Sequence, residues 1–252
     1  MMDYCGYEMF LSGFANAQSE DQLYEQLERC CRNLGFEKFA MGHHVNFNGP
    51  PEDAIRLTNY HPDWIERTLV HNLYRDDPVH HASMKGATAF MWSRIPQMIS
   101  LTPRQMAILE AARNYGLGFG FTVPVNVPGE YCGTCSFGTS SMDALRPDAL
   151  MLAQWFVPHA FDAARAIMQR RNKAHQNLIL RPSLTDRQHD ALVLMCRGKS
   201  DAEIGYLLGI SHSTVHTHVE NIRRAYGNAQ RAYLIVRALF DGQVSFAEVF
   251  RR

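Results

Sequence analysis

Residues Lys199–Ala225 read KSDAEIGYLLGISHSTVHTHVENIRRA, and this stretch predicts two short helices joined by a glycine turn. Gly209 supplies a residue that tolerates positive φ at the turn. The small Gly205 would let the two helices cross closely, and Val215 would plug the second helix onto the first. A small residue, a turn and an apolar plug in this order predict a helix-turn-helix.

The second helix of the pair carries polar and basic side chains that suit contact with DNA. Ser211 or Ser213 would cap its first turn and leave backbone amides facing a phosphate. Its outer face would meet base edges, and Arg223 and Arg224 would bind the backbone. The candidate DNA-binding residues are Lys199, Ser211, Ser213, Thr214, His216, Thr217, Glu220, Arg223 and Arg224. The alternative is a helical hairpin in an unrelated core.

The charges of the chain divide between its two parts. Its 25 basic and 25 acidic residues balance overall, but the segment from Arg165 onward holds 14 Lys and Arg against 7 Asp and Glu. A basic C-terminal third on an acidic body is typical of a nucleic-acid-binding module attached to a domain with another task.

Bulk composition narrows the class of protein. A chain of 252 residues with 46% hydrophobic content is long enough for one large or two ordinary packed domains. No basic run followed by an apolar segment opens the sequence, and no run of about 18 apolar residues occurs, so we expect a soluble, cytoplasmic protein without a membrane role. Six scattered cysteines are too few for a disulfide scaffold.

Periodicity upstream of the helix-turn-helix predicts helices before and after several antiparallel strands. Helical spacing covers residues 21–34, 64–72, 102–114 and 147–171, with a bend at Pro158. Strands are expected over 36–48, 118–127 and 131–139, with Pro128-Gly129 as a hairpin turn. The pattern is that of an α+β domain followed by a small all-α domain. The expected boundaries are 1–171 for the first domain, 172–183 for a basic linker and 184–252 for the second domain.

The segment from Leu184 to Val244 resembles the LuxR-type DNA-binding domain, a four-helix module. The residues that carry the resemblance are Leu184, Thr185, Arg187, Leu192, Gly198, Lys199, Ile204, Ser211, Thr214, Val215, His218, Val219, Ile222 and Gly227. The family often has Lys or Arg where His216 stands, and Glu220 is acidic in a helix that faces a polyanion. The operator sequence therefore does not follow from the resemblance.

The first domain resembles the autoinducer-binding domain of LuxR-family quorum-sensing receptors over roughly residues 23–169. The motifs that carry this resemblance are YHPDW at 60–64, DDP at 76–78, FMWS at 90–93 and GLGFGFTVP at 116–124. A phosphoacceptor domain, the other common partner of this DNA-binding module, would need an acidic pair and a repeated βα pattern that the sequence lacks. The resemblance implies an α-β-α sandwich with an antiparallel sheet.

The resemblance also implies a ligand, an N-acyl homoserine lactone. Asp77 would accept the amide N–H of the ligand, and Trp64 would donate its indole N–H to the lactone carbonyl. Tyr60 and Ser136 stand where some members place hydroxyls that reach the amide carbonyl. Trp92 matches an aromatic wall around the lactone ring. The family also has a glycine at the position of Gly120, where it keeps a strand close to its neighbours.

Thr68 departs from the family pattern, which has a tyrosine four residues after the tryptophan of the pocket. The missing ring opens space along the acyl chain or the amide. Two readings follow: the pocket tolerates an unusual acyl group, or it takes a different ligand, such as an aryl or plant-derived compound. A regulator that folds and binds DNA without any ligand is a third possibility.

An enzyme with a regulatory tail is the alternative from another class. It would use the paired histidines His43-His44 and His80-His81 and a metal. Adjacent residues of a strand point in opposite directions, and the Cys132/Cys135 pair has no second pair of matching spacing. We therefore predict a regulator without cofactor, metal or catalysis. It would bind double-stranded DNA as a homodimer that reads a palindrome, formed through the helix 147–171 and through a last helix over 229–240.

Overall fold

The computed structural model describes residues 4–51, 54–127, 130–172 and 182–250. The chain divides into two compact units, one formed by most of the residues up to 174 and the other by the C-terminal residues. The expected hairpin turn at Pro128-Gly129 and most of the expected linker over 172–183 lie outside the described residues.

A five-stranded antiparallel sheet forms the centre of the first unit. Its strands are β1 (Lys38–His43), β2 (Arg56–Thr58), β3 (Phe90–Met91), β4 (Phe119–Val125) and β5 (Gly133–Thr139), in the spatial order β2-β1-β5-β4-β3. Every neighbouring pair is antiparallel. The central strands β4 and β5 form the expected hairpin, and β1 pairs along the other edge of β5. The prediction of an antiparallel sheet is therefore confirmed.

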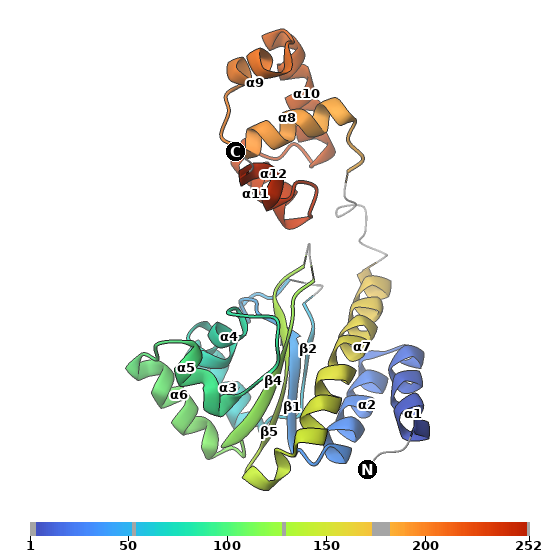
Figure 1. Ribbon diagram of the computed structural model, residues 1–252, viewed down its shortest axis with the longest axis vertical. Coiled ribbons are helices and arrows are strands. Elements are labelled where there is room, and N and C mark those ends of the chain that lie inside the picture. The colour runs from blue at the N-terminus through green and yellow to red at the C-terminus, as the bar shows by residue number, and fades with distance from the viewer. Residues whose placement is uncertain (1–3, 52–53, 128–129, 173–181, 251–252) are drawn as a thin grey trace. The chain divides into compact units, whose positions relative to one another are not determined.

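Helices cover both faces of this sheet (Figure 1). One face packs against α2 (Glu20–Asn33) and α7 (Pro147–Asn172), and α1 (Tyr4–Asn16) packs on these two helices. The opposite face carries shorter helices: α3 (Pro62–Val70), α4 (Pro78–Ser83), α5 (Ile95–Met98) and α6 (Pro103–Arg113), with single 3-10 turns at Leu73–Arg75 and Trp92–Arg94. A third such turn, Met142–Ala144, precedes α7. The unit is the expected α-β-α sandwich.

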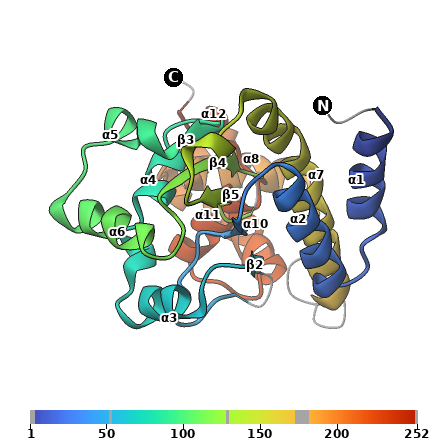
Figure 2. The ribbon, with the colours of Figure 1, turned by 90° about the horizontal axis from the view of Figure 1, so that it is seen from below.

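Strand alternation gives the two faces of the sheet different chemistry. On β5, Cys135 and Phe137 belong to the large apolar core shared with α1, α2 and α7. Their neighbours Thr134 and Ser136 lie on the opposite face. The apolar face makes the main core, so the polar face is left to shape a site. Figure 2 shows the two groups of helices on either side of the strands.

The second unit is all-helical. It contains α8 (Asp186–Cys196), α9 (Asp201–Leu208), α10 (His212–Ala225), α11 (Arg231–Phe240) and α12 (Phe246–Phe250). Gly209 ends α9 at φ 65°, and a Cβ on Gly205 would lie 2.9 Å from the Ile210 carbonyl oxygen. Val215 is fully buried between the helices. These are the turn, the close crossing and the plug predicted for a helix-turn-helix.

Several elements differ from the sequence-based expectation. Helices α1, α4, α5 and α12 and strands β2 and β3 were not predicted. The strand expected over 36–48 is only Lys38–His43, and the helix expected last is followed by α12. Helix α7 matches the expected long helix, with Pro158 inside it, and the bend expected there stays a prediction. Among the described helices none is long and apolar enough to span a membrane.

Candidate functional site

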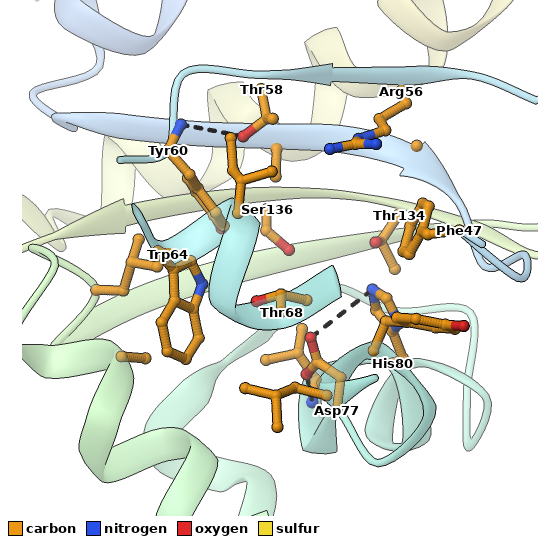
Figure 3. A pocket seen from close by; sticks show the side chains of 18 of the residues that line it. Phe47, Arg56, Thr58, Tyr60, Trp64, Thr68, Asp77, His80, Thr134 and Ser136 are labelled. Atoms are coloured by element: carbon orange, nitrogen blue, oxygen red, sulfur yellow. Dashed lines mark hydrogen bonds and ion pairs between the residues drawn. The ribbon is translucent and has the colours of Figure 1, made fainter. Parts of the chain in front are cut away.

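A cavity lies between the polar face of the sheet and the helices α3 to α6, and Figure 3 shows it from close by. Its volume of about 160 Å³ is roughly ten times what one water needs, so it is no packing defect. The walls nearest α3 and α6 are apolar. The predicted ligand-binding residues that line it are Tyr60, Trp64, Thr68, Asp77, Trp92 and Ser136. Gly120 is the one residue of that prediction that does not.

Tyr60 and Trp64 stand at one end of the cavity. Trp64 is held in α3 by burial and by its ring contact with Tyr115, at 5.2 Å between centroids. Neither the Trp64 indole N–H nor the Tyr60 hydroxyl has a hydrogen-bond partner among the described residues. Burial, with a contribution from the charge of Asp77, raises the pKa of Tyr60, so its hydroxyl keeps its proton. Both groups are therefore available as donors to a ligand.

Thr68 lies one helical turn beyond Trp64 on the same helix and faces the cavity (Figure 3). Its Oγ1 is buried and has no hydrogen-bond partner. A buried polar atom without a partner costs about 1–3 kcal/mol, and a ligand that bonds to it removes that cost. The small side chain also leaves open the space that a larger residue would fill.

Asp77 is fixed by the start of α4. Its Oδ1 accepts the backbone N–H of Val79 at 2.8 Å and so caps the helix, while Pro78 occupies the first helical position. Its Oδ2 lies 3.9 Å from Nε2 of His80. Capping uses one oxygen, and the second remains on the side of the cavity as an acceptor for a ligand N–H.

Trp92 and Ser136 line the cavity and are linked by hydrogen bonds through Thr122, which does not line it. The Trp92 indole N–H donates to Oγ1 of Thr122 at 2.8 Å, and the two hydroxyls of Thr122 and Ser136 lie 2.9 Å apart. Gly120 acts indirectly, because a Cβ at this position would lie 2.5 Å from the Trp92 ring. The glycine therefore lets the indole lie flat on β4.

His44 and His80 form a stacked pair of rings beside the cavity. Their ring centroids lie 3.9 Å apart, and Nε2 of His44 lies 3.2 Å from Oγ1 of Thr134. Burial, aided by the neighbouring histidines, lowers the pKa of His44 to about 2, so the ring is neutral. Within the described ranges no three His, Cys, Asp or Glu side chains gather in a way that could hold a metal ion.

Helix α10 presents most of the candidate DNA-binding residues. Its N-cap is Ser211, whose Oγ accepts the backbone N–H of Thr214 at 3.1 Å, and Ser213 lies in the first turn. Thr214, His216 and Thr217 are exposed, whereas Val215 is buried. Thr217 also donates its hydroxyl to the Ser213 carbonyl at 3.0 Å.

The candidate basic residues of this unit differ in how strongly they are paired with other groups of the protein. Arg223 bonds to Oε1 of Glu220 at 2.6 Å and to the Ala229 carbonyl at 3.1 Å, so Glu220 is paired within its own helix. Arg224 is exposed, and its guanidinium makes only a long contact among the described residues, 3.5 Å to Oδ1 of Asn221. Lys199 pairs with Glu203 at 3.2 Å. Arg224 is therefore the freest cation of the helix.

Among the polar residues that sequence reasoning did not assign to the ligand site, Arg56, His80 and Thr134 line the cavity. Thr122 does not line the cavity itself but positions two residues that do. The others belong to short elements, or to strand positions whose contacts across the sheet depend on the register between strands. For Thr134 the alternation of β5 around the predicted Ser136 was a usable signal, since residues two apart share a face.

Comparisons with known proteins agree with this organisation. Residues 19–164 match the family "Autoinducer binding domain" and residues 182–238 match "Bacterial regulatory proteins, luxR family". The transcriptional activator protein AhyR of Aeromonas hydrophila is 25% identical over 92% of this chain and 90% of its own length. The transcriptional activator protein LuxR of Aliivibrio fischeri is 27% identical over 76% of each chain.

Solved structures share the fold. A crystal structure of SdiA from Escherichia coli aligns with a TM-score of 0.67 at 22% identity, over 96% of this chain and 99% of that chain. A structure of SdiA in complex with octanoyl-rac-glycerol aligns with a TM-score of 0.65 at 23% identity, over 96% and 97% of the two chains.

Proposed function

The chain belongs to the LuxR family of autoinducer-binding, DNA-binding regulators, and from this premise we propose that its signal is an N-acyl homoserine lactone. The observation that carries the proposal is the set of polar groups on the cavity wall. Donors on Tyr60 and Trp64 lie at one end, and an acceptor oxygen of Asp77 faces the same space. An acyl homoserine lactone offers two carbonyl oxygens and one amide N–H, which is the complementary set.

The remaining surface of the cavity suits an apolar body. Ile65, Leu69 and Leu73 contribute from the α3 side, and Ile108 and Leu117 contribute from the α6 side. Trp92 adds a flat aromatic wall for a ring. The hydroxyl of Ser136 can either accept from or donate to the hydroxyl of Thr122. When it accepts from Thr122, its own O–H is free to donate to a ligand carbonyl. Binding would bury apolar surface and supply partners for polar groups that have none, so the ligand should stabilise the first unit.

A non-lactone signal is the second candidate, and the unpartnered hydroxyl of Thr68 favours it. One solved structure of this fold is of SdiA in complex with octanoyl-rac-glycerol, whose head group is no lactone. The two candidates differ in the amide N–H, which a lactone amide offers to Asp77 and an acylglycerol does not.

A thermal-shift measurement with paired variants tests the lactone proposal. Trp64→Phe keeps an aromatic ring, though a smaller one, and deletes the indole N–H, and Asp77→Asn keeps a side-chain cap for α4 while removing the carboxylate. Both variants should melt near the wild-type temperature without ligand. With N-hexanoyl-homoserine lactone, each should lose most of the wild-type shift, since each lost charged or neutral bond is worth about 1–3 kcal/mol. An unchanged shift in Asp77→Asn contradicts the assigned pocket.

We also propose that the protein binds a palindromic operator as a homodimer. Large apolar side chains are exposed on both helices that the sequence analysis assigned to the dimer. They are Met151 and Trp155 on α7, and Tyr233 and Val236 on α11. A symmetric dimer would present two copies of α10 to successive turns of the major groove.

A further inference from the structure

The end of the cavity away from Trp64 is polar, although the acyl portion of a lactone would reach it. The strand register shows how it is built. Gly42 on β1 pairs with Arg56 on β2 and with Thr134 on β5, so the three share one cross-strand row on the cavity face. A second row, two residues along and about 7 Å away, contains Thr58 and Ser136.

Gly42 makes a slot in the middle of the first row. Directly opposed residues lie about 5 Å apart across the strands, so an atom above Gly42 is within reach of both neighbours. A Cβ on Gly42 would fill this position and would lie 2.7 Å from the Ile55 carbonyl oxygen. The glycine is therefore required by the close approach of β2, and a ligand atom would lie farther from the strand than this Cβ, between the two polar side chains.

Thr134 offers a hydrogen-bond donor to this slot. Its side chain is 4% exposed, and Nε2 of His44 lies 3.2 Å from its oxygen. The other nitrogen of His44, Nδ1, is buried without a partner. Because a buried N–H without an acceptor is rarer than a bare acceptor, the proton of the neutral ring belongs on Nε2. Thr134 then accepts from His44, and its own O–H is free to donate to a ligand.

Arg56 supplies the donors on the other side of the slot. Its guanidinium lies 5.4 Å from the centroid of Phe47, and Phe47 packs edge-on against Tyr74 at 5.0 Å. No carboxylate pairs with Arg56 in the described parts of the chain. A guanidinium has five N–H donors and no acceptor. Figure 3 places Arg56, Thr134 and Phe47 together, at the opposite end from Trp64.

We propose that the acyl portion of the ligand ends in an acceptor oxygen, a carboxylate or a hydroxyl, which lies above Gly42 between Arg56 and Thr134. This inference rests on the proposed function for the orientation of the ligand, with its head group near Trp64. An alkyl end would give the buried Thr134 hydroxyl no partner and would leave the exposed Arg56 unused. An oxygen at this place accepts from both, and a carboxylate does so most strongly.

Paired probes test the inference by calorimetry on the full-length protein. N-adipoyl-homoserine lactone and N-hexanoyl-homoserine lactone have the same number of carbons, and only the first ends in a carboxylate. The wild type should bind the adipoyl compound about tenfold more tightly, which corresponds to about 1.4 kcal/mol. Arg56→Gln should reduce that preference to less than about threefold. Equal binding of both lactones by the wild type overturns the inference.

Matched variants show whether a change in the binding preference comes from Arg56 and Thr134 or from a general effect of substitution. Arg29→Gln removes an exposed arginine from α2, on the opposite face of the sheet, and should leave the preference intact. Thr134→Val should lower the preference, and Thr134→Ser, which keeps the hydroxyl, should restore it. Melting temperatures identify any variant that fails to fold. If Thr134→Val fails to fold, the preference measured in Thr134→Ser decides the question. A preference that survives in both Arg56→Gln and Thr134→Val overturns the inference.

A second pair of probes, the N-methylamides of the same two acyl groups, separates this inference from the lactone proposal. If the lactones bind no more tightly than the matching amides, the lactone proposal fails. The Arg56-dependent preference, measured in the amides, still decides the inference in that case. Absence of binding by all four compounds overturns both.

Discussion

At the scale of single residues, Gly120 determines where Trp92 can lie. The Cβ of Gly120→Ala would come within 2.5 Å of the Trp92 ring, so the indole must move and its 2.8 Å bond to Thr122 must stretch. We expect the variant to lose about 1–3 kcal/mol of unfolding free energy, as overpacked sites do. Its ligand affinity should fall about tenfold or more, measured by calorimetry with the lactone.

Gly133→Ala is the matched control for this variant. Its Cβ would lie 2.6 Å from Phe161, a residue of the main apolar core, so it should cost comparable stability. Because Gly133 does not line the cavity, ligand affinity should stay near that of the wild type. Equal losses of affinity in both variants would contradict the role given to Gly120.

Residues of the cavity divide by whether the sequence predicted them. Trp64 and Asp77 follow recognisable motifs, and both line the cavity. Arg56 and Thr134 stand in no such motif. Their meeting above Gly42 depends on the pairing of three strands that are far apart in the sequence, and register across non-local strands is not readable from one strand at a time.

At the scale of elements, α10 combines a paired and a free arginine. Arg224→Ala should weaken binding to all DNA sequences alike and reduce the slope of log affinity against log salt by about one. Arg223→Ala removes the bonds to Glu220 and Ala229, so it should mainly lower the melting temperature of the second unit. A loss confined to one base position in Arg224→Ala would contradict a phosphate contact.

Helix α9 begins with a capping box that responds to acid. The backbone and side-chain hydrogen bonds from Ser200, with Lys199 nearby, lower the pKa of Glu203 from 4.5 to about 2. A carboxylate with a depressed pKa contributes stability that is present above pH 4.5 and is lost as the pH falls toward 2. The melting temperature of the second unit should therefore fall as the pH is lowered from 4.5 to 2.

Glu203→Gln is the control for the acid response. Glutamine retains a capping box, as Gln188 does with Thr185 at the start of α8, but it has no carboxylate to protonate. The variant should lose less of its melting temperature than the wild type between pH 4.5 and pH 2. An identical pH dependence in the two proteins would show that other carboxylates dominate.

Prediction of elements succeeded where periodicity was strong and failed where packing decides. Helix α2 has a clear apolar stripe and a serine cap, and it was predicted. Helix α1 contains Gly6 and Gly13, which disfavour a helix. It is stabilised by burial, because Phe10 and Phe14 pack on Phe156 of α7, at 5.3 and 6.3 Å between ring centroids.

At the scale of the whole molecule, the proposed dimer depends on two exposed apolar surfaces. Placing a charge in one of them, as in Trp155→Asp on α7, should weaken self-association because a charge resists burial at an interface. Sedimentation of the ligand-bound protein measures the effect. Trp155 does not line the cavity, so the thermal shift with ligand should persist. Unchanged self-association would show that the dimer interface does not include Trp155.

The small molecule retained by the protein purified from its native host identifies the signal. Mass analysis of the extracted compound should find about one acyl amide of homoserine lactone per chain, with an oxygen at the end of the acyl group. The compound should be missing from the Asp77→Asn variant prepared in the same way. A stoichiometric compound without an acylated amine, or full retention by Asp77→Asn, would contradict the account.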